Sequence, residues 1–199
     1  IAGTGAPGFS GDGAAAINAQ LNNPLKVYAD SSGNLYIADR INHRIRMIDV
    51  NGTITTVAGT GTNGFSGDGG QATSAMLSWP WIATKDSVGN LFIVDSENDR
   101  IRKVAPNGVI TTVAGSGEGF SGDGGQATSA KLNNPADVIV ASDGSLYIAD
   151  SYNHRIRKVA TDGIITTVAG SGPSGFGNGA HAGDGGPAIS ARFNQISSI

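Results

Sequence analysis

The string Gly-Phe-Ser-Gly-Asp-Gly occurs three times in this sequence, beginning at Gly8, Gly64 and Gly119, and a degraded fourth copy surrounds Gly183–Gly186. The aspartates of the four copies lie 56, 55 and 61 residues apart. A chain that repeats itself at such a period consists of similar units that pack against their neighbours. Residues that recur in every unit are therefore expected to build the unit, and residues that break the repeat are the better candidates for a function.

The composition fits one sizeable folded domain. The 199 residues carry a formal net charge of −3 and include 31 glycines, which fall at fixed points of each repeat and so predict turns rather than a low-complexity segment. The absence of cysteine excludes a disulfide framework and a thiolate metal site. No apolar run approaches the roughly 20 residues that cross a bilayer. The mild acidity gives no sign of a surface that follows phosphates, so nucleic acid is not an expected partner.

Within each repeat the sequence predicts four short antiparallel strands. In the second repeat these are residues 81–86, 91–95, 100–104 and 109–113, most of them rich in β-branched and aromatic residues. The last two strands are joined through Asn107-Gly108, a pair typical of type I′ hairpin turns. The stretch from Gln71 to Leu77 is expected to form one or two helical turns, within a connection that is otherwise a glycine-rich loop.

Four strands per repeat favour an all-β fold built from radial blades. In such a β-propeller each four-stranded antiparallel blade buries both of its faces against its neighbours. A two-sheet sandwich is the alternative, but it explains four strands per repeat poorly.

The strand and turn residues of each repeat resemble the NHL repeat. The resemblance rests on Asn42-His43-Arg44-Ile45-Arg46 and Asn153-His154-Arg155-Ile156-Arg157, each preceded by Leu-Tyr-Ile-Ala-Asp. The second repeat departs from the pattern, because Asp99 stands where the others have histidine. The match covers residues 1–199 as one propeller segment, with repeats at approximately 1–56, 57–112 and 113–167 and a partial repeat at 168–199.

The resemblance to the NHL repeat implies a six-bladed ring, of which three full blades are about half. Ile1-Ala2-Gly3 matches Val57-Ala58-Gly59, so we expect the chain to begin inside a repeat. The rest of the ring is then expected from the same longer chain or from another copy, because isolated repeats cannot bury their terminal faces.

Several recurring polar residues are expected to be structural. Asp39, Asp95 and Asp150 end the second strand of each repeat, and Arg44, Arg100 and Arg155 begin the third. A contact of each carboxylate with the backbone or with this arginine would hold the hairpin together. His43 and His154 recur in different blades, so they are not expected to share a metal ion. The glycines of Gly59–Gly64 match the spacing of a dinucleotide-binding motif. Such a site also needs a helix that begins at the glycines, and none is predicted there, so we expect these glycines to form turns.

The aspartates of the Gly-Asp-Gly copies are the one set of candidate calcium ligands: Asp12, Asp68, Asp123 and Asp184. Calcium takes carboxylate and backbone oxygens from flexible loops. One carboxylate per repeat is sparse for such a site, so we expect these aspartates to cap backbone amides of the loop or of the short helix instead. No cofactor is expected beyond this calcium possibility.

Trp79 and Trp81 are the most conspicuous break in the repeat. They stand on either side of Pro80, where the other repeats have Asn and Leu or Asn and Ala. Two aromatic rings at one loop–strand junction could form a stacking platform for a sugar or for a side chain of a partner. Filling a gap under the loop is the alternative.

A second break lies in the first strand, whose third position reads Lys26, Ile82 and Asp137 in successive repeats. The NHL resemblance places glycine at this position and places this strand at the central channel. Lys26 and Asp137 would then form a charged mouth for a ligand, or pair with each other. His181, in an extended fourth loop at 175–186, is expected to be a surface histidine.

These observations favour a non-catalytic scaffold of NHL type that binds a protein or carbohydrate partner through loop faces, outside the cell or at its surface. The alternative is a propeller enzyme, since some related six-bladed propellers are lyases or hydrolases with a metal at the ring axis. Such a site needs convergent ligands around an open coordination position, which missing blades would have to supply in part.

Overall fold

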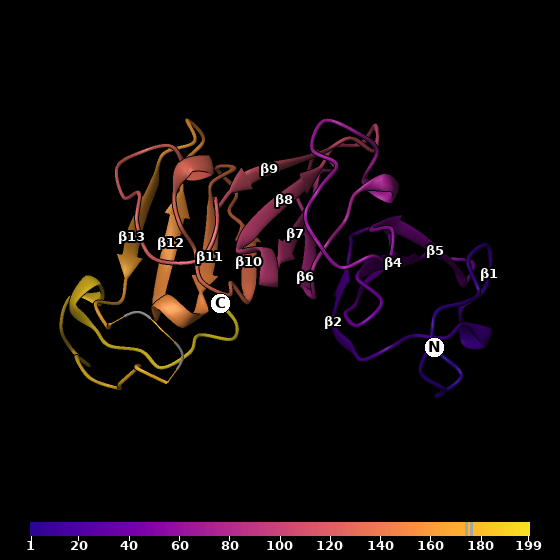
Figure 1. The fold of residues 1–199 in the computed structure, drawn as a ribbon, viewed down its shortest axis with the longest axis horizontal. Coiled ribbons are helices and arrows are strands. Elements are labelled where there is room, and N and C mark those ends of the chain that lie inside the picture. The colour runs from indigo at the N-terminus through magenta and orange to yellow at the C-terminus, as the bar shows by residue number, and fades with distance from the viewer. Residues whose placement is uncertain (174, 176) are drawn as a thin grey trace. The chain divides into compact units, whose positions relative to one another are not determined.

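The computed structural model describes residues 1–173, 175 and 177–199, and it is built almost entirely from short strands (Figure 1). Ser174 and Phe176 lie outside the described residues, so part of the extended fourth loop is not described. The strands are β1 (Ala14–Ala15), β2 (Pro24–Ala29), β3 (Leu35–Asp39), β4 (Arg44–Ile48), β5 (Thr53–Ala58), β6 (Pro80–Lys85), β7 (Leu91–Asp95), β8 (Arg100–Val104), β9 (Ile110–Ala114), β10 (Asp137–Val140), β11 (Leu146–Asp150), β12 (Arg155–Val159) and β13 (Ile165–Ala169).

These strands form three antiparallel sheets, one for each repeat. Their orders are β1-β5-β4-β3-β2, β6-β7-β8-β9 and β10-β11-β12-β13, so consecutive strands are neighbours except that β1 pairs with β5. The predicted four-stranded antiparallel unit is therefore confirmed, with strand ends shifted by a residue. The first sheet gains a fifth, two-residue strand, because Ala14 and Ala15 pair with Ile54 and Thr53 at its outer edge. The size of the ring and its blade number stay predictions.

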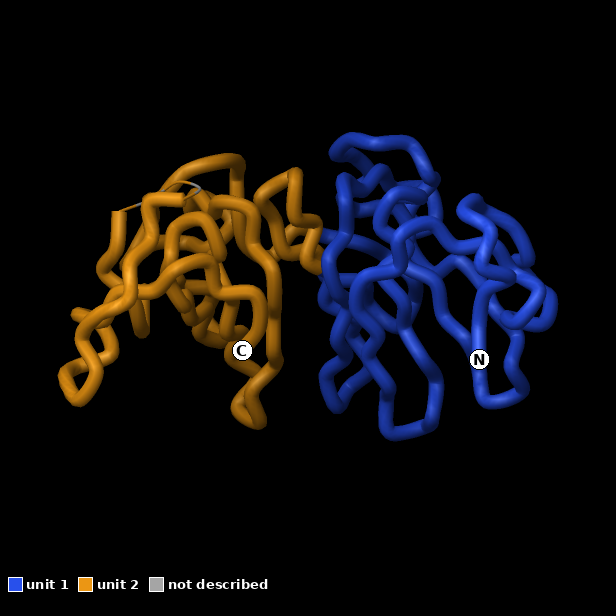
Figure 2. Tube along the Cα trace, turned by 90° about the horizontal axis from the view of Figure 1, so that it is seen from below, with its two compact units in different colours: residues 1–93, 103–111 blue, residues 94–102, 112–199 orange. Residues whose placement is uncertain are grey.

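The chain divides into two compact units, coloured separately in Figure 2. The first consists of Ile1–Ile93 with Lys103–Thr111, and the second of Val94–Arg102 with Thr112–Ile199. The first sheet belongs wholly to the first unit and the third sheet wholly to the second.

Strand β3 shows why these sequences read as nearly continuous apolar runs. Tyr36 and Ala38 join one buried cluster with Ala83 and Ile93, whereas Ile37 packs on the other face of the sheet with Ile54. A strand that is buried on both faces has no polar side to alternate with. The core of the first unit is thus made of small and branched side chains facing both ways from a central strand.

The outer hairpins use a turn that differs from the predicted one. The amide of Gly108 donates to the carbonyl of Ala105, and among the residues of this loop only Gly108 has a positive φ, of +84°. This is the pattern of a type I turn followed by a left-handed residue, not of type I′, which needs two left-handed residues. In the second repeat Pro106 favours this turn, since proline presets the φ of the second position of a type I turn.

The short helices are single 3₁₀ turns: η1 (Ala16–Asn18), η2 (Ala72–Ser74), η3 (Ser96–Asn98), η4 (Ala127–Ser129), η5 (Ser151–Asn153) and η6 (Ala188–Ser190). The predicted helical turn in 71–77 is confirmed as η2. Its N-cap is Gln71, which makes no capping bond through its side chain. In the part of the chain that the structure describes, no helix is long and apolar enough to cross a membrane.

Candidate functional site

The first and the third sheet each contain a fully buried arginine that binds two aspartates. The guanidinium of Arg157 lies 2.8 Å from the carboxylate of Asp123 and 3.1 Å from that of Asp150, and it also donates to the carbonyl of Ser121. In the first sheet, Arg46 makes the same contacts with Asp12 at 2.7 Å and with Asp39 at 3.3 Å. The loop aspartate is thus the outer half of a two-carboxylate clamp on a buried cation.

This clamp corrects the prediction that the Gly-Asp-Gly aspartates cap backbone amides. One oxygen of Asp12 accepts from Arg46 and the other accepts from the hydroxyl of Thr56 at 2.7 Å. Asp68 holds the same place in the second copy of the motif, and Asp184 is exposed. Among the described residues, no group of three or more His, Cys, Asp or Glu side chains could hold a metal ion.

Of the two partners predicted for the strand-end aspartate, a backbone group is found, since Asp39 accepts from the amide of Asn22 at 2.7 Å, whereas the arginine is a different one. Asp39 lies opposite Arg44 in the backbone register, but its carboxylate binds Arg46, two residues further on. Arg44 instead donates to the carbonyls of Asn42 and Thr60. The guanidinium of Arg44 fits in this position only because residue 61 is glycine, since a Cβ at Gly61 would collide with it.

The remaining letters of the repeated motif pack around the clamp. The ring of Phe120 lies under the guanidinium of Arg155 at 4.0 Å and that of Arg157 at 4.9 Å. Gly122 has a φ of +93°, and a Cβ there would lie 2.6 Å from the Cβ of Ala130. A cation–π contact and a close backbone approach therefore account for phenylalanine and glycine at these positions.

The histidine of the NHL pattern is a hydrogen-bond acceptor. His154 is buried and left-handed, with a φ of 55°; its Nδ1 accepts from the amide of Gln195 at 3.0 Å, and its Nε2 contacts the carbonyl of Gly175. His43 accepts from the amide of Trp79 in the same way, at 3.3 Å. Burial lowers the pKa of His43, and the charge of Arg44 lowers it further, which favours the neutral acceptor.

Asp99 takes the place of this histidine and keeps its role. It has a φ of 54°, and its carboxylate accepts from the amide of Asn134 at 2.8 Å. Burial raises the pKa of Asp99 to about 6; the bond from Asn134 opposes this shift, while the charges of Glu118 and Glu97 add to it. The departure from the family pattern is therefore conservative in geometry, because a carboxylate replaces an imidazole as the acceptor.

Trp79 and Trp81 surround a cation that the sequence analysis missed. The guanidinium of Arg40 lies 4.6 Å from the ring centre of Trp79 and 4.8 Å from that of Trp81. The imidazole of His43 meets Trp79 edge to face at 6.0 Å. We call Arg40, Trp79 and Trp81 the Arg40 cluster. All three side chains are half-buried.

A signal for Arg40 was present in the sequence. Counted by repeat, Arg40 stands where the other repeats have Ser96 and Ser151. The hydroxyl of Ser96 donates to the carbonyl of Pro135 at 2.8 Å, so the equivalent position next to Asn134 is small and internally satisfied. Aligning the repeats position by position, rather than looking for unusual residues, would have found the arginine together with the tryptophans.

The other predicted site residues are placed as follows. Asp137 is 4% exposed, and its carboxylate accepts from the hydroxyl of Ser198 at 2.8 Å and from the amide of Ile199 at 3.2 Å. Lys26 is half-buried and belongs to the first unit, whereas Asp137 belongs to the second. The charged mouth and the pairing of these two residues stay predictions. His181 is exposed.

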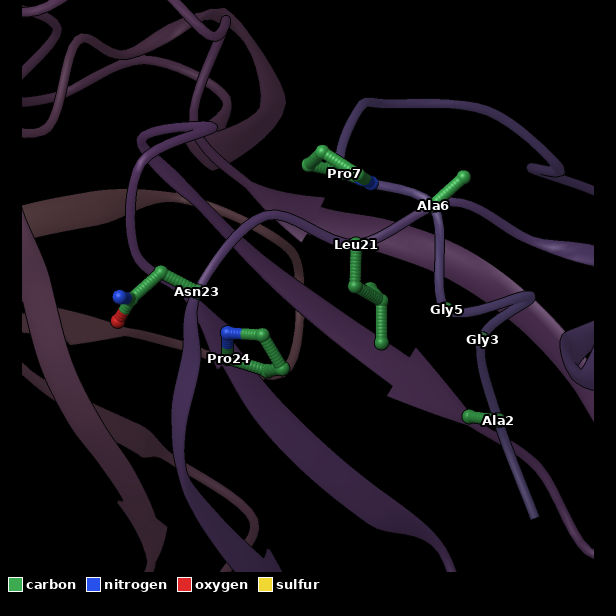
Figure 3. Close-up of a pocket in the computed structure, with 8 residues that line it drawn as sticks. All are labelled: Ala2, Gly3, Gly5, Ala6, Pro7, Leu21, Asn23 and Pro24. Carbon is green, nitrogen blue, oxygen red and sulfur yellow. The ribbon is translucent and has the colours of Figure 1, made fainter.

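A pocket of about 260 Å³ lies where the first glycine loop faces the start of β2 (Figure 3). Its lining residues are Ala2, Gly3, Gly5, Ala6, Pro7, Leu21, Asn23 and Pro24. Figure 3 shows Leu21 between Pro24 and the Gly3–Gly5 turn. No titratable side chain lines this pocket, so it offers contact surface rather than acid, base or nucleophile.

Two comparisons of sequence identify relatives of this chain. Residues 5–66 and 117–174 match the family described as teneurin NHL domain. Human teneurin-4 is 34% identical over 211 residues, which cover 95% of this chain and 7% of teneurin-4. The chain therefore spans less than a tenth of the length of this relative.

Solved structures show the same kind of fold. An auxiliary nutrient binding protein from Bacteroides ovatus superposes with a TM-score of 0.63 at 18% identity, over 91% of this chain and 43% of that protein. A catalytically inactive virginiamycin B lyase from Staphylococcus aureus, solved with quinupristin, superposes with a TM-score of 0.51 at 17% identity, over 75% and 43%. At these identities the likeness shows the fold alone.

Proposed function

The chain belongs to the teneurin NHL domain family, and we propose that it is a non-catalytic scaffold that binds a partner through its loops. Family membership supports a repeat fold of propeller type as the frame of this scaffold. With such a frame the activity has to reside in the residues that vary between repeats, because function is carried by sites grafted onto folds.

The observation that carries the proposal is the Arg40 cluster. In the part of the chain that the structure describes, these recurring polar residues already have structural partners: Arg46 and Arg157 are held by two carboxylates each, and His154 by two backbone groups. The Arg40 cluster lies outside this pattern. Tryptophan and arginine are also the residue types that most often dominate binding at interfaces.

The partner we propose is a protein or a carbohydrate, and the location is outside the cell or at its surface. Low charge and near-identical repeats support this location. The remainder of the propeller is proposed to come from the same longer chain or from another copy.

The experiment is a binding screen with matched variants. The immobilised protein is presented to a panel of purified ectodomains and oligosaccharides, and each response is repeated with the double variant Trp79→Ala/Trp81→Ala. The control is Asn23→Ala/Leu25→Ala, which removes the equivalent side chains of the first repeat. We expect at least one partner whose affinity falls at least ten-fold in the tryptophan variant and stays within two-fold in the control, with circular dichroism unchanged. Partners that bind all three proteins equally would exclude this site.

A further inference from the structure

We propose that the Arg40 cluster recognises an ionised carboxylate, carried by an aspartate or glutamate side chain of a partner protein. This inference rests on the proposed function, since it names the ligand chemistry of the same site. Arg40 is the anchor, and the two tryptophans form its apolar surround.

The first argument is charge. Within the described residues, the side chain of Arg40 makes no ion pair and no hydrogen bond; its contacts are the two tryptophan rings. By contrast, Lys85 of the same unit lies 3.2 Å from Asp30. A guanidinium presents its donors as a rigid fork that fits a carboxylate.

The second argument is an unmatched pair of donors. Nε of Arg40 and Nε1 of Trp81 are both buried without a hydrogen-bond acceptor. Buried polar groups in native proteins nearly always have a partner, but Nε of Arg102 and Nε of Arg157 also lack one, so the pair shows only that the chain supplies no acceptor at this place. Both orphaned groups can only donate. The ligand must therefore offer acceptors, and an ionised carboxylate offers nothing else.

The third argument is that the cluster replaces a satisfied junction. At the equivalent position of the next repeat, the hydroxyl of Ser96 contacts the side-chain oxygen of Asn134 and the carbonyl of Pro135. The hydrogen-bonding groups of that junction are thus satisfied within the chain. Arginine and two tryptophans have replaced serine, asparagine and alanine at the junction of the first and second repeats. Three changes that together remove internal acceptors are explained by an acceptor on a partner.

A protein carboxylate fits these features better than a sugar does. A sugar ring stacks on an open aromatic face, but Arg40 already covers one face of each tryptophan. Sugar hydroxyls also need acceptors as well as donors, and the orphaned groups of the cluster are donors. Ile41, next to Arg40, is 38% exposed and extends the apolar surround that excludes water at a protein interface.

The test uses tryptophan emission, because Trp79 and Trp81 are the two tryptophans of the sequence and so report on this cluster alone. A tryptophan-free peptide with several glutamates is titrated into the protein, and its glutamine counterpart is titrated in parallel. We expect a saturable emission change with the glutamate peptide, an affinity at least ten-fold weaker for the glutamine peptide, and weaker binding as salt is raised.

The variants separate charge from geometry. Arg40→Gln should weaken binding of the glutamate peptide at least ten-fold. Arg40→Lys keeps the charge but lacks the fork of donors, so its affinity for the glutamate peptide should lie between that of the parent protein and that of Arg40→Gln. Arg192→Gln, which removes an exposed arginine of the second unit, should leave binding unchanged.

Three results would overturn the inference: equal binding of both peptides, an unchanged affinity of Arg40→Gln, or saturable binding of an oligogalacturonate that exceeds that of the peptide. The last would assign the cluster to an acidic sugar. A partner from the screen that loses affinity in the tryptophan double variant, yet binds Arg40→Gln normally, would refute the inference and leave the proposed function standing.

Discussion

The two carboxylates that hold Arg157 differ in exposure, and this difference can be measured as stability. Asp150 is fully buried, whereas 41% of the side-chain surface of Asp123 is exposed. Replacing either residue by asparagine keeps the size of the side chain and removes its charge. Because both variants act on one arginine, the cation is the same in the two measurements.

Asp150→Asn should be the costlier change. It removes a buried partner of a buried charge, for which losses of about 3–5 kcal/mol are typical. It also weakens bonds from the amide of Asn133 and from the side chain of Asn153. Asp123→Asn removes a partly exposed partner that water can replace, which costs about 1 kcal/mol. In a chain of this size, about 1 kcal/mol shifts Tm by roughly 2–4 °C, so we expect drops of about 10 °C and about 3 °C.

The assay is thermal unfolding followed by calorimetry, with Asp184→Asn as the control. Asp184 is the exposed aspartate of the degraded fourth motif, and its variant should unfold within about 1 °C of the parent protein. Equal losses for Asp123→Asn and Asp150→Asn would refute the burial argument. A rise in Tm on adding millimolar calcium, present in the parent protein and absent in Asp123→Asn, would assign the loop carboxylate to an ion rather than to the arginine.

Three further predictions concern Asp99, Gly122 and Phe120. Because the pKa of Asp99 is raised from 3.8 to about 6, its contribution to stability is present below about pH 4 and lost as pH rises through 6. On going from pH 7 to pH 4.5, the free energy of unfolding of Asp99→Asn should therefore rise by about 1 kcal/mol less than that of the parent protein, after allowance for partial exposure. Urea unfolding at the two pH values measures this difference, and an equal rise in both proteins would contradict the prediction. Gly122→Ala should cost about 3 kcal/mol, against about 1 kcal/mol for Gly124→Ala, which has an equally positive φ but no atom within 4 Å of the new Cβ. Equal Tm values for the two would exclude the close approach. Phe120→Leu should lose about 1 kcal/mol of cation–π attraction that Phe120→Tyr retains, and equal losses would refute that contact.

The strands and their order could be predicted because they depend on local patterns repeated three times. Asp39, Arg44 and Arg46 show where this reasoning ends. The sequence places both arginines on one strand two residues apart, so alternation puts them on the same face and leaves open which one the carboxylate binds. The choice depends on Asp12, which lies 34 residues from Arg46 and supplies the second carboxylate. The same separation of 34 residues recurs between Asp123 and Arg157, so the contact leaves a trace only in the comparison of whole repeats and not in the pattern of one strand.

The hairpin turn shows a different kind of error. Asn51-Gly52 suits type I′ when it is considered alone, but the carboxylate of Asp49 accepts from the amides of Asn51 and Thr53 and holds the loop in the other turn. Side-chain bonds of this kind compete with the intrinsic preference of the two central residues. This aspartate stands two positions before the Asn-Gly pair in the sequence.

Repeat proteins offer a way to separate structural departures from functional ones, and Asp99 and Arg40 illustrate it. Asp99 replaces a histidine, yet the amide of Asn134 still meets an acceptor, so the junction keeps its hydrogen bond. Arg40 replaces a serine whose equivalent bonds to a carbonyl, and it brings a charge that the described residues leave unpaired. The first substitution preserves the balance of donors and acceptors inside the unit, whereas the second removes it. A repeat therefore tolerates the first without a partner, whereas in the second the two tryptophan rings lie against the unpaired cation. The unmatched donors at Arg40 are thus the chemistry that the proposed partner would complete.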